Sequence, residues 1–371
     1  MQFSQIPGNQ PIKDSLLSSH KRGAVAHAQL FAGAEGGAAL SLALAFGQYI
    51  LCESKMEDDA CGECPSCQKV AKGVHPDVHF FYPKPAAKSD PALVANMQKQ
   101  WRSFIQENPY GDLETWQRFA DINDKAVQIH KEEAKNIIKT VSLKSFEGNY
   151  KILIIWYAET MNIAAANAIL KVLEEPPEKT LYFLVSYNLE NVISTITSRT
   201  QLVSVPPFTQ DEVAGLLLKN GISESEAGNA SRIAEGSLLK AEKILQEGGE
   251  LAYGDFQTWM RACLKGDFTD LVKRSERFSQ SGKGNQSSEL KYALSLLRES
   301  MVSLCNHTSL NHVLGEELIF IQKFGATAQL DKLGKMYEKV NEAIYHLERN
   351  ANPRITHLSL SIDFTKILNQ G

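Results

Sequence analysis

Two short, continuously apolar runs predict strands that are buried on both faces of a parallel sheet. They are residues 152–155 (Ile-Leu-Ile-Ile) and 181–185 (Leu-Tyr-Phe-Leu-Val). Between them, residues 161–175 space their apolar side chains as a helix does, and the pattern stops at Pro176-Pro177. Strands that alternate with helices at this distance are typical of a doubly wound α/β domain.

After residue 206 the pattern becomes helical. Thr209 and Glu212 have the spacing of an N-terminal capping box, which predicts the first helix of a small lid. Farther along, for example over 290–304 and 330–347, apolar residues recur at helical spacing and predict an all-helical domain. We therefore expect an α/β domain over 1–206, a helical lid over 207–248 and a helical C-terminal domain over 249–371.

A glycine-rich turn after an earlier apolar segment has the frame of a phosphate-binding loop. Residues 29–40 read Gln-Leu-Phe-Ala-Gly-Ala-Glu-Gly-Gly-Ala-Ala-Leu and lead into a helix-like run. A working loop uses glycines to wrap backbone N–H groups around phosphates, a lysine to meet their charge and a hydroxyl to hold magnesium. The candidate loop keeps Gly33, Gly36 and Gly37 but has Ala39 at the lysine and Leu40 at the hydroxyl. A plain strand-to-helix turn would look similar.

The end of the 152–155 strand lacks a second part of a nucleotide site. In nucleotide hydrolases, acidic residues at this point hold magnesium and orient the attacking water. This chain has Trp156-Tyr157 there. Glu159 lies past the strand end, and we expect it to cap or flank the next helix.

Four of the six cysteines, Cys52, Cys61, Cys64 and Cys67, cluster in one short stretch and predict a metal site. Three of them have Cys-x-x-Cys-x-x-Cys spacing, and four thiolates around one zinc ion make a closed, structural site. An iron–sulfur cluster uses the same spacing, so the spacing leaves that interpretation open. Disulfides and unligated thiols also compete with zinc. Disulfides are disfavoured in a cytosolic chain, and free thiols would leave residues 53–59 without a core.

Composition limits the function classes. The chain has 371 residues, enough for two or three domains, and a net charge of −4, which argues against a surface that coats nucleic acid. No apolar run is long enough to span a bilayer and the start of the chain has no leader pattern, so we expect a cytoplasmic protein without a membrane partner. Residues 83–124 form a polar insertion with two tryptophans, which we expect to be a helical pair of no assigned function.

Four segments together resemble the clamp-loader ATPases of the AAA+ superfamily, and among them the delta-prime branch of bacterial DNA polymerase III. They are residues 3–8 (Phe-Ser-Gln-Ile-Pro-Gly), 27–33 (His-Ala-Gln-Leu-Phe-Ala-Gly), 167–177 (Asn-Ala-Ile-Leu-Lys-Val-Leu-Glu-Glu-Pro-Pro) and 198–200 (Ser-Arg-Thr). The run that ends in the two prolines is the most specific. The likeness is good as far as the predicted lid, and beyond it rests on length and helical character.

The resemblance implies an AAA+ α/β fold, a zinc module inserted after the first helix, and a C-terminal collar that holds a ring of subunits together. In this family a serine-arginine-cysteine triplet offers an arginine finger to ATP on the neighbouring subunit. The match puts that role on Arg199, with Ser198 before it, while Thr200 departs from the usual cysteine. The family's lid motif has an ATP-sensing arginine where this chain has Leu239.

Chemistry alone also allows this role for Arg199. A guanidinium is planar and always charged, so it can insert between phosphoryl oxygens as negative charge develops there. An arginine offered to another subunit needs no nucleotide on its own. The competing interpretation is an ordinary arginine that pairs with a surface carboxylate.

The first of three functional hypotheses is a clamp-loader subunit with a degenerate nucleotide site, part of the DNA polymerase holoenzyme but without ATPase activity of its own. It would bind gamma/tau-type ATPase subunits and the delta subunit, and through them the sliding clamp and primer–template DNA. Its cofactor would be structural Zn²⁺, with no ATP or Mg²⁺ in its own site. The second hypothesis is an active P-loop ATPase of replication or repair, and the third is a zinc-stabilised scaffold.

Overall fold

The computed structural model describes residues 1–85, 91–122, 125–246, 249–305, 315–349 and 351–369. The chain divides into two compact units. The first unit comprises Met1–Lys219 with Glu235–Lys240, and the second comprises Asn220–Ala234 with Ala241–Gly371. The boundary predicted at 248 lies outside the described residues, and the limits of the three predicted domains stay predictions.

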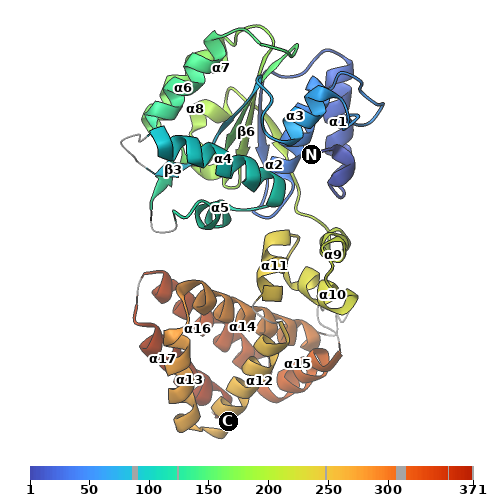
Figure 1. The fold of residues 1–371 in the computed structure, drawn as a ribbon. Coiled ribbons are helices and arrows are strands. Elements are labelled where there is room, and N and C mark those ends of the chain that lie inside the picture. The colour runs from blue at the N-terminus through green and yellow to red at the C-terminus, as the bar shows by residue number, and fades with distance from the viewer. Residues whose placement is uncertain (86–90, 123–124, 247–248, 306–314, 350, 370–371) are drawn as a thin grey trace. The chain divides into compact units, whose positions relative to one another are not determined.

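The first unit is built on a five-stranded parallel sheet (Figure 1). Its strands, in spatial order, are β2 (Val78–Phe81), β5 (Lys151–Trp156), β6 (Thr180–Ser186), β1 (Ala28–Ala32) and β7 (Gln201–Ser204). Both predicted apolar runs lie in strands, β5 and β6, in which every residue is buried. Continuous apolar runs occur here because parallel strands at the centre of a sheet have helices on both faces.

Alternate residues of these strands face different helices. On one face, Leu153 and Tyr182 share a core with α6 (Lys131–Ser142) and α7 (Ile163–Glu174). On the other face, Phe183 stacks on Phe46 of α2 (Ala39–Leu51), with ring centroids 5.4 Å apart. Helix α2 is buried along its whole length, which explains why this segment lacks a polar stripe. Also in this unit are α1 (Gln10–Lys21), α3 (Pro65–Ala71) and α8 (Ser194–Thr197).

The insertion contains the predicted helical pair, α4 (Pro91–Glu107) and α5 (Leu113–Phe119), near the short strands β3 (Lys84–Pro85) and β4 (Val127–Gln128). The insertion packs on the end of β5 through aromatic rings. Trp101 stacks on Tyr82 at 4.2 Å and contacts Trp156 at 5.0 Å and Trp116 at 5.2 Å. The residue at the end of β5 is thus a tryptophan with a packing role.

Helices follow the sheet. Thr209 and Glu212 form the predicted capping box, with the Thr209 N–H donating to Glu212 Oε2 at 2.8 Å and the Glu212 N–H donating to Thr209 Oγ1 at 3.3 Å. The helices after this box are α9 (Gln210–Lys219), α10 (Glu224–Ile233), α11 (Leu238–Gln246), α12 (Gly249–Lys265), α13 (Phe268–Gln280), α14 (Lys283–Leu304), α15 (Gly315–Ala328), α16 (Leu330–Glu348) and α17 (Pro353–Asn369). Among the described residues, no helix has both the length and the apolar character that crossing a membrane requires.

The core of the second unit includes a buried polar network. His357 is stacked on Trp259 and shares a hydrogen bond with Ser275 through Nδ1 at 3.0 Å. Burial lowers the pKa of His357 to about 3, so the ring is neutral at physiological pH. Trp259 in turn donates from Nε1 to Ser361 at 2.9 Å. The network joins α12, α13 and α17.

A buried carboxylate fixes the loop between α6 and β5. Asp77 accepts hydrogen bonds from the backbone N–H groups of Phe146 (2.5 Å), Glu147 (2.8 Å) and Gly148 (2.7 Å). Burial by itself raises the pKa of Asp77, but these donors outweigh it and the net pKa is lowered. The loop thus has a defined backbone although the Phe146 side chain is 81% exposed.

We expect Asp77→Asn to lower the free energy of unfolding by about 1–3 kcal/mol at pH 7, because an amide cannot accept all of these bonds as a carboxylate does. Because the pKa of Asp77 is lower in the folded state, its carboxylate stabilises the fold at pH values above the unfolded-state pKa, and this stabilisation is lost as the pH falls through the folded-state pKa. In urea unfolding, the difference in free energy of unfolding between wild type and Asp77→Asn should therefore become smaller below a pH of about 4. The exposed Asp331→Asn is the control, and a gap that does not depend on pH would contradict this account.

Candidate functional site

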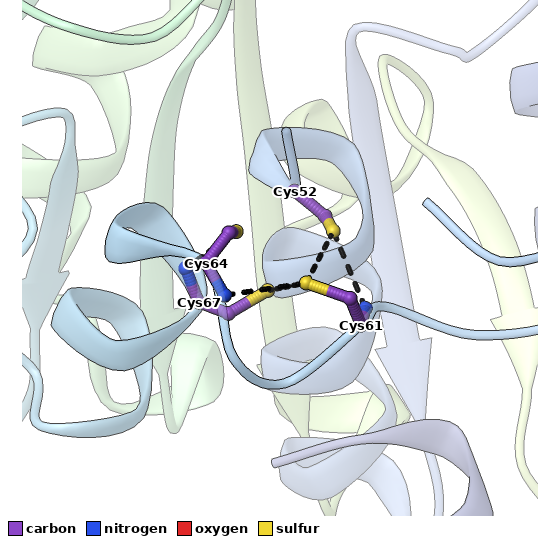
Figure 2. A group of neighbouring side chains, drawn as sticks. All are labelled: Cys52, Cys61, Cys64 and Cys67. Carbon is purple, nitrogen blue, oxygen red and sulfur yellow. Dashed lines mark hydrogen bonds between the residues drawn. The ribbon is translucent and has the colours of Figure 1, made fainter. Parts of the chain in front are cut away.

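The four cysteines meet at the junction of α2 and α3 (Figure 2). Cys52 follows the last residue of α2, and Cys64 is the N-cap of α3, where its sulfur accepts the N–H of Cys67 at 3.4 Å. The N–H of Cys61 points to Cys52 Sγ and the N–H of Cys64 to Cys61 Sγ, each at 3.3 Å. Backbone donors, chiefly the N–H of Cys64, lower the pKa of Cys61 to about 6, whereas burial raises the pKa of Cys52 and of Cys67. Backbone N–H groups aimed at sulfur stabilise thiolates, the form that binds metal.

The sulfur spacing fits a single tetrahedral ion. All four ligand atoms lie within 4.8 Å of one another, with Cys52 and Cys61 sulfurs at 3.5 Å and Cys61 and Cys67 sulfurs at 3.9 Å. Four thiolates at the usual zinc–sulfur bond length stand about 3.8 Å apart. None of the four cysteines forms a disulfide bond. The predicted cluster is therefore present and could hold a metal ion.

The segment that carries the four cysteines, residues 52–67, is hydrogen-bonded to the start of the chain. The Asp59 carboxylate accepts the N–H groups of Phe3 at 3.0 Å and Ser4 at 2.9 Å. Gln2 donates from Nε2 to the carbonyl of Ala60 at 2.7 Å. Asp59 lies between two ligand positions, so the fold of the metal loop and the docking of residues 2–4 depend on each other.

The glycine-rich loop stands where the sequence predicts it, between β1 and α2, but its surroundings are filled by other parts of the same unit. Leu238 donates from its N–H to the carbonyl of Gly36 at 3.1 Å, and Ser237 Oγ donates to the carbonyl of Glu35 at 2.8 Å. A Cβ on Gly36 would lie 2.1 Å from Ser237 Oγ and 2.9 Å from the Cβ of Leu239. Leu239 therefore lies against the loop, at the position where the resemblance expects an arginine.

The insertion reaches the same loop from another direction. Tyr157 donates from its hydroxyl to the Glu35 carboxylate at 2.7 Å and accepts the N–H of Leu113 at 3.0 Å. Ser41 near the start of α2 donates to the carbonyl of Pro109 at 3.0 Å. Burial, followed by the nearby Tyr187 and Glu35, raises the pKa of Tyr157, so its hydroxyl keeps its proton. Sequence reasoning missed the Tyr157–Glu35 pair, because nothing local links residues so far apart.

Glu159 has a different role from the one expected. Its carboxylate accepts the N–H groups of Tyr187 at 2.9 Å and Asn188 at 3.1 Å, and so holds the turn after β6. Helix α7 is capped by Asn162, whose side chain accepts the N–H of Ala165 at 2.8 Å. Burial raises the pKa of Glu159.

Arg199 follows α8 and Ser198, and it has a partner on α7. Its Nε donates to Glu174 Oε1 at 2.5 Å, and Nη2 pairs with the same oxygen. Nη1 donates to the carbonyl of Thr195 at 3.0 Å and to Ser198 Oγ at 3.2 Å. The side chains of Arg199 and Glu174 are 33% and 47% exposed. Arg199 is thus a surface arginine with a carboxylate partner, which is compatible with either interpretation of its role.

Comparison with known proteins gives the family. The model described as DNA polymerase III, delta subunit, matches residues 8–209, more than half of the chain. The chain belongs to the DNA polymerase III delta-prime family. The match includes the sheet, the cysteine cluster, the glycine-rich loop and Arg199.

Two relatives show the extent of the similarity. The chain is 25% identical to DNA polymerase III subunit delta' of Yersinia pestis over 303 residues, 79% of this chain and 75% of that protein. It is 26% identical to the Escherichia coli K12 subunit delta' over 241 residues, 65% of this chain and 60% of that protein. The solved structure of a DNA polymerase III gamma-subunit-related protein from Thermotoga maritima has a TM-score of 0.38 at 15% identity, over 94% of this chain and 99% of that one.

The predicted fold class is confirmed for this delta-prime family member. It has a parallel α/β domain with a four-cysteine cluster, followed by a C-terminal region whose described elements are all helices. Within the first unit the candidate functional residues fall into three groups: the cysteine cluster, the glycine-rich loop with residues 235–240, and Arg199 with Glu174.

Proposed function

We propose that this chain is the delta-prime-type subunit of a DNA polymerase III clamp loader, with a degenerate nucleotide site that does not bind MgATP. It would bind gamma/tau-type ATPase subunits and the delta subunit in a ring, offer Arg199 to ATP on a neighbouring subunit, and so help load the sliding clamp on primed DNA in the cytoplasm. The observation that carries the proposal is the state of the glycine-rich loop: its scaffold is kept, while its surroundings are taken up by Ser237, Leu238 and Tyr157.

The loop chemistry supports this proposal in three ways. Ala39 and Leu40 offer neither an ammonium for phosphate nor a hydroxyl for magnesium, and both are fully buried. Glu35 brings a negative charge into the loop, which opposes a triphosphate. The end of β5 offers Trp156 and Tyr157 where a hydrolase needs carboxylates.

The position of Arg199 supports its role toward another subunit. It stands just before β7, which is the edge strand of the sheet in the described part of the chain, so none of the described strands lies beyond it. Leu202 on β7 is exposed, as a residue covered by a partner would be in the isolated chain. An arginine on such a face can reach a phosphate bound outside its own chain.

For the metal we propose structural zinc, held by Cys52, Cys61, Cys64 and Cys67. Four sulfur ligands close the coordination sphere, so the ion would have no open position for water or substrate. The close sulfur spacing favours one ion over an iron–sulfur cluster, because a cluster carries its ligands on separate iron atoms and spreads them farther apart.

Nucleotide titration separates this proposal from an active P-loop ATPase. With a fluorescent ATP analogue and Mg²⁺, we expect no saturable binding in the micromolar range, because the loop lacks its lysine and its magnesium ligand. A gamma/tau-type ATPase subunit under the same conditions is the positive control. Magnesium-dependent micromolar binding to this chain would favour the active ATPase. The trans role is tested by reconstitution with the ATPase subunits, using wild type and Arg199→Ala.

A further inference from the structure

The guanidinium of Arg199 is held by its own chain through all three nitrogens. Nε and Nη2 face the Glu174 carboxylate, while Nη1 donates to the Thr195 carbonyl and to Ser198 Oγ. An arginine that binds a terminal phosphate uses the same fork of Nε and Nη donors. In the structure of the single chain, Arg199 can therefore contact a phosphate through these donors only after their contacts with Glu174 are broken.

Glu174 is well placed to act as such a competitor. It is the last residue of α7, directly before Glu175 and the two prolines that end the helix, so its backbone is held by the helix it terminates. Its side chain is 47% exposed and that of Arg199 is 33% exposed. An ion pair that is this open to solvent is weak. A terminal phosphate carries more negative charge than a carboxylate and can bind the guanidinium through bidentate hydrogen bonds, so it can displace the Glu174 carboxylate.

We propose that Glu174 is a positioning residue that holds Arg199 against its own chain until the terminal phosphate of a nucleoside triphosphate on the neighbouring subunit replaces the carboxylate. This inference rests on the proposed trans role of Arg199. Glu174 contacts neither substrate nor the reacting atoms and acts only through the arginine. It makes engagement of the arginine conditional on a triphosphate, since an empty neighbouring site offers no anion to compete.

The expected effect is on nucleotide affinity, and the maximal rate should not change. Once the phosphate has displaced the carboxylate, Glu174 no longer touches the arginine. Removal of the Glu174 carboxylate therefore makes it easier for the phosphate to bind Arg199, but does not change the complex in which Arg199 already contacts the phosphate. In a reconstituted complex, Glu174→Gln should lower the ATP concentration that gives half-maximal DNA-dependent hydrolysis by about two- to five-fold, the range of a weak surface pair.

The adjacent Glu175→Gln is the matched control. Glu175 is also exposed and carries the same charge, but among the described ion pairs it has no cationic partner. It should leave both the half-maximal ATP concentration and the maximal rate unchanged. If Glu174→Gln leaves the half-maximal concentration unchanged or raises it, or if it lowers the maximal rate, the proposal is wrong. Equal shifts in the two variants would show a general effect of charge and would also overturn it.

A double variant separates this inference from the function on which it rests. In Arg199→Ala/Glu174→Gln the effect of the glutamate change should vanish, because no guanidinium remains to be held. If Arg199→Ala alone leaves hydrolysis unchanged, the trans role and the inference both fail. If Arg199→Ala abolishes stimulation but Glu174→Gln has no effect, only the role of Glu174 fails.

Discussion

Replacement of Arg199 by alanine is expected to lower hydrolysis at the neighbouring ATP site by about 10³-fold or more, the usual contribution of an arginine finger to kcat. In the proposed trans role, the guanidinium would neutralise the negative charge that develops on the transferred phosphoryl group. The chain should still fold and join the complex, since the Arg199–Glu174 pair is partly exposed and adds little to stability. The measurement is DNA-dependent ATP hydrolysis by the reconstituted complex, with assembly checked by size-exclusion chromatography.

Two further variants make the result specific. Arg199→Lys keeps the positive charge but loses the planar fork, so it should restore only part of the rate. Arg118→Ala removes another exposed arginine that pairs with a glutamate, at 3.1 Å, and should have no effect. If Arg199→Ala stimulates hydrolysis as well as wild type, the trans role is lost, and Arg199 is a surface residue that pairs with Glu174 and does no more.

Loss of the metal is the second large effect that we expect. The purified chain should contain about one zinc ion, the number that one four-thiolate site holds. Cys67→Ala should abolish that zinc and lower the free energy of unfolding by more than about 4 kcal/mol, as expected when a structural metal is lost. Cys67 is fully buried, so its removal also leaves a space among the remaining thiols. Metal analysis and urea unfolding measure the two effects.

The connection to the start of the chain explains why the effect should extend beyond the metal loop. Asp59 holds Phe3 and Ser4 only while the loop between Cys52 and Cys61 keeps its shape. Phe3 in turn packs beside Tyr49 of α2. The control is Cys305→Ala, because Cys305 is an exposed cysteine outside the cluster. A zinc content well below one ion per chain, or visible absorption from iron, would contradict the assignment.

Much of the α/β domain follows from local pattern. The strands β5 and β6 are apolar because each is buried on both faces, and α7 stops where Pro176 and Pro177 cannot continue it. Cysteine spacing predicted the metal cluster, since cysteines three positions apart in a turn, such as Cys61, Cys64 and Cys67, can bind one ion. Glu159 shows the limit of such reasoning: it lies in a short 3-10 helix (Ala158–Thr160) just before α7, but it does not cap α7, and its carboxylate instead holds the turn after β6.

The sequence by itself therefore determined which chemistry is possible, because that depends on residue identity: Ala39 cannot bind a phosphate as a lysine does, and Cys52 can bind a metal. Only the tertiary structure decided what takes the place of the missing chemistry. Trp156 packs on the insertion, Tyr157 donates a hydrogen bond to Glu35, and Arg199 donates a hydrogen bond to Glu174. These pairs join residues from different elements, and their contacts depend on how strands and helices pack, which local periodicity does not encode.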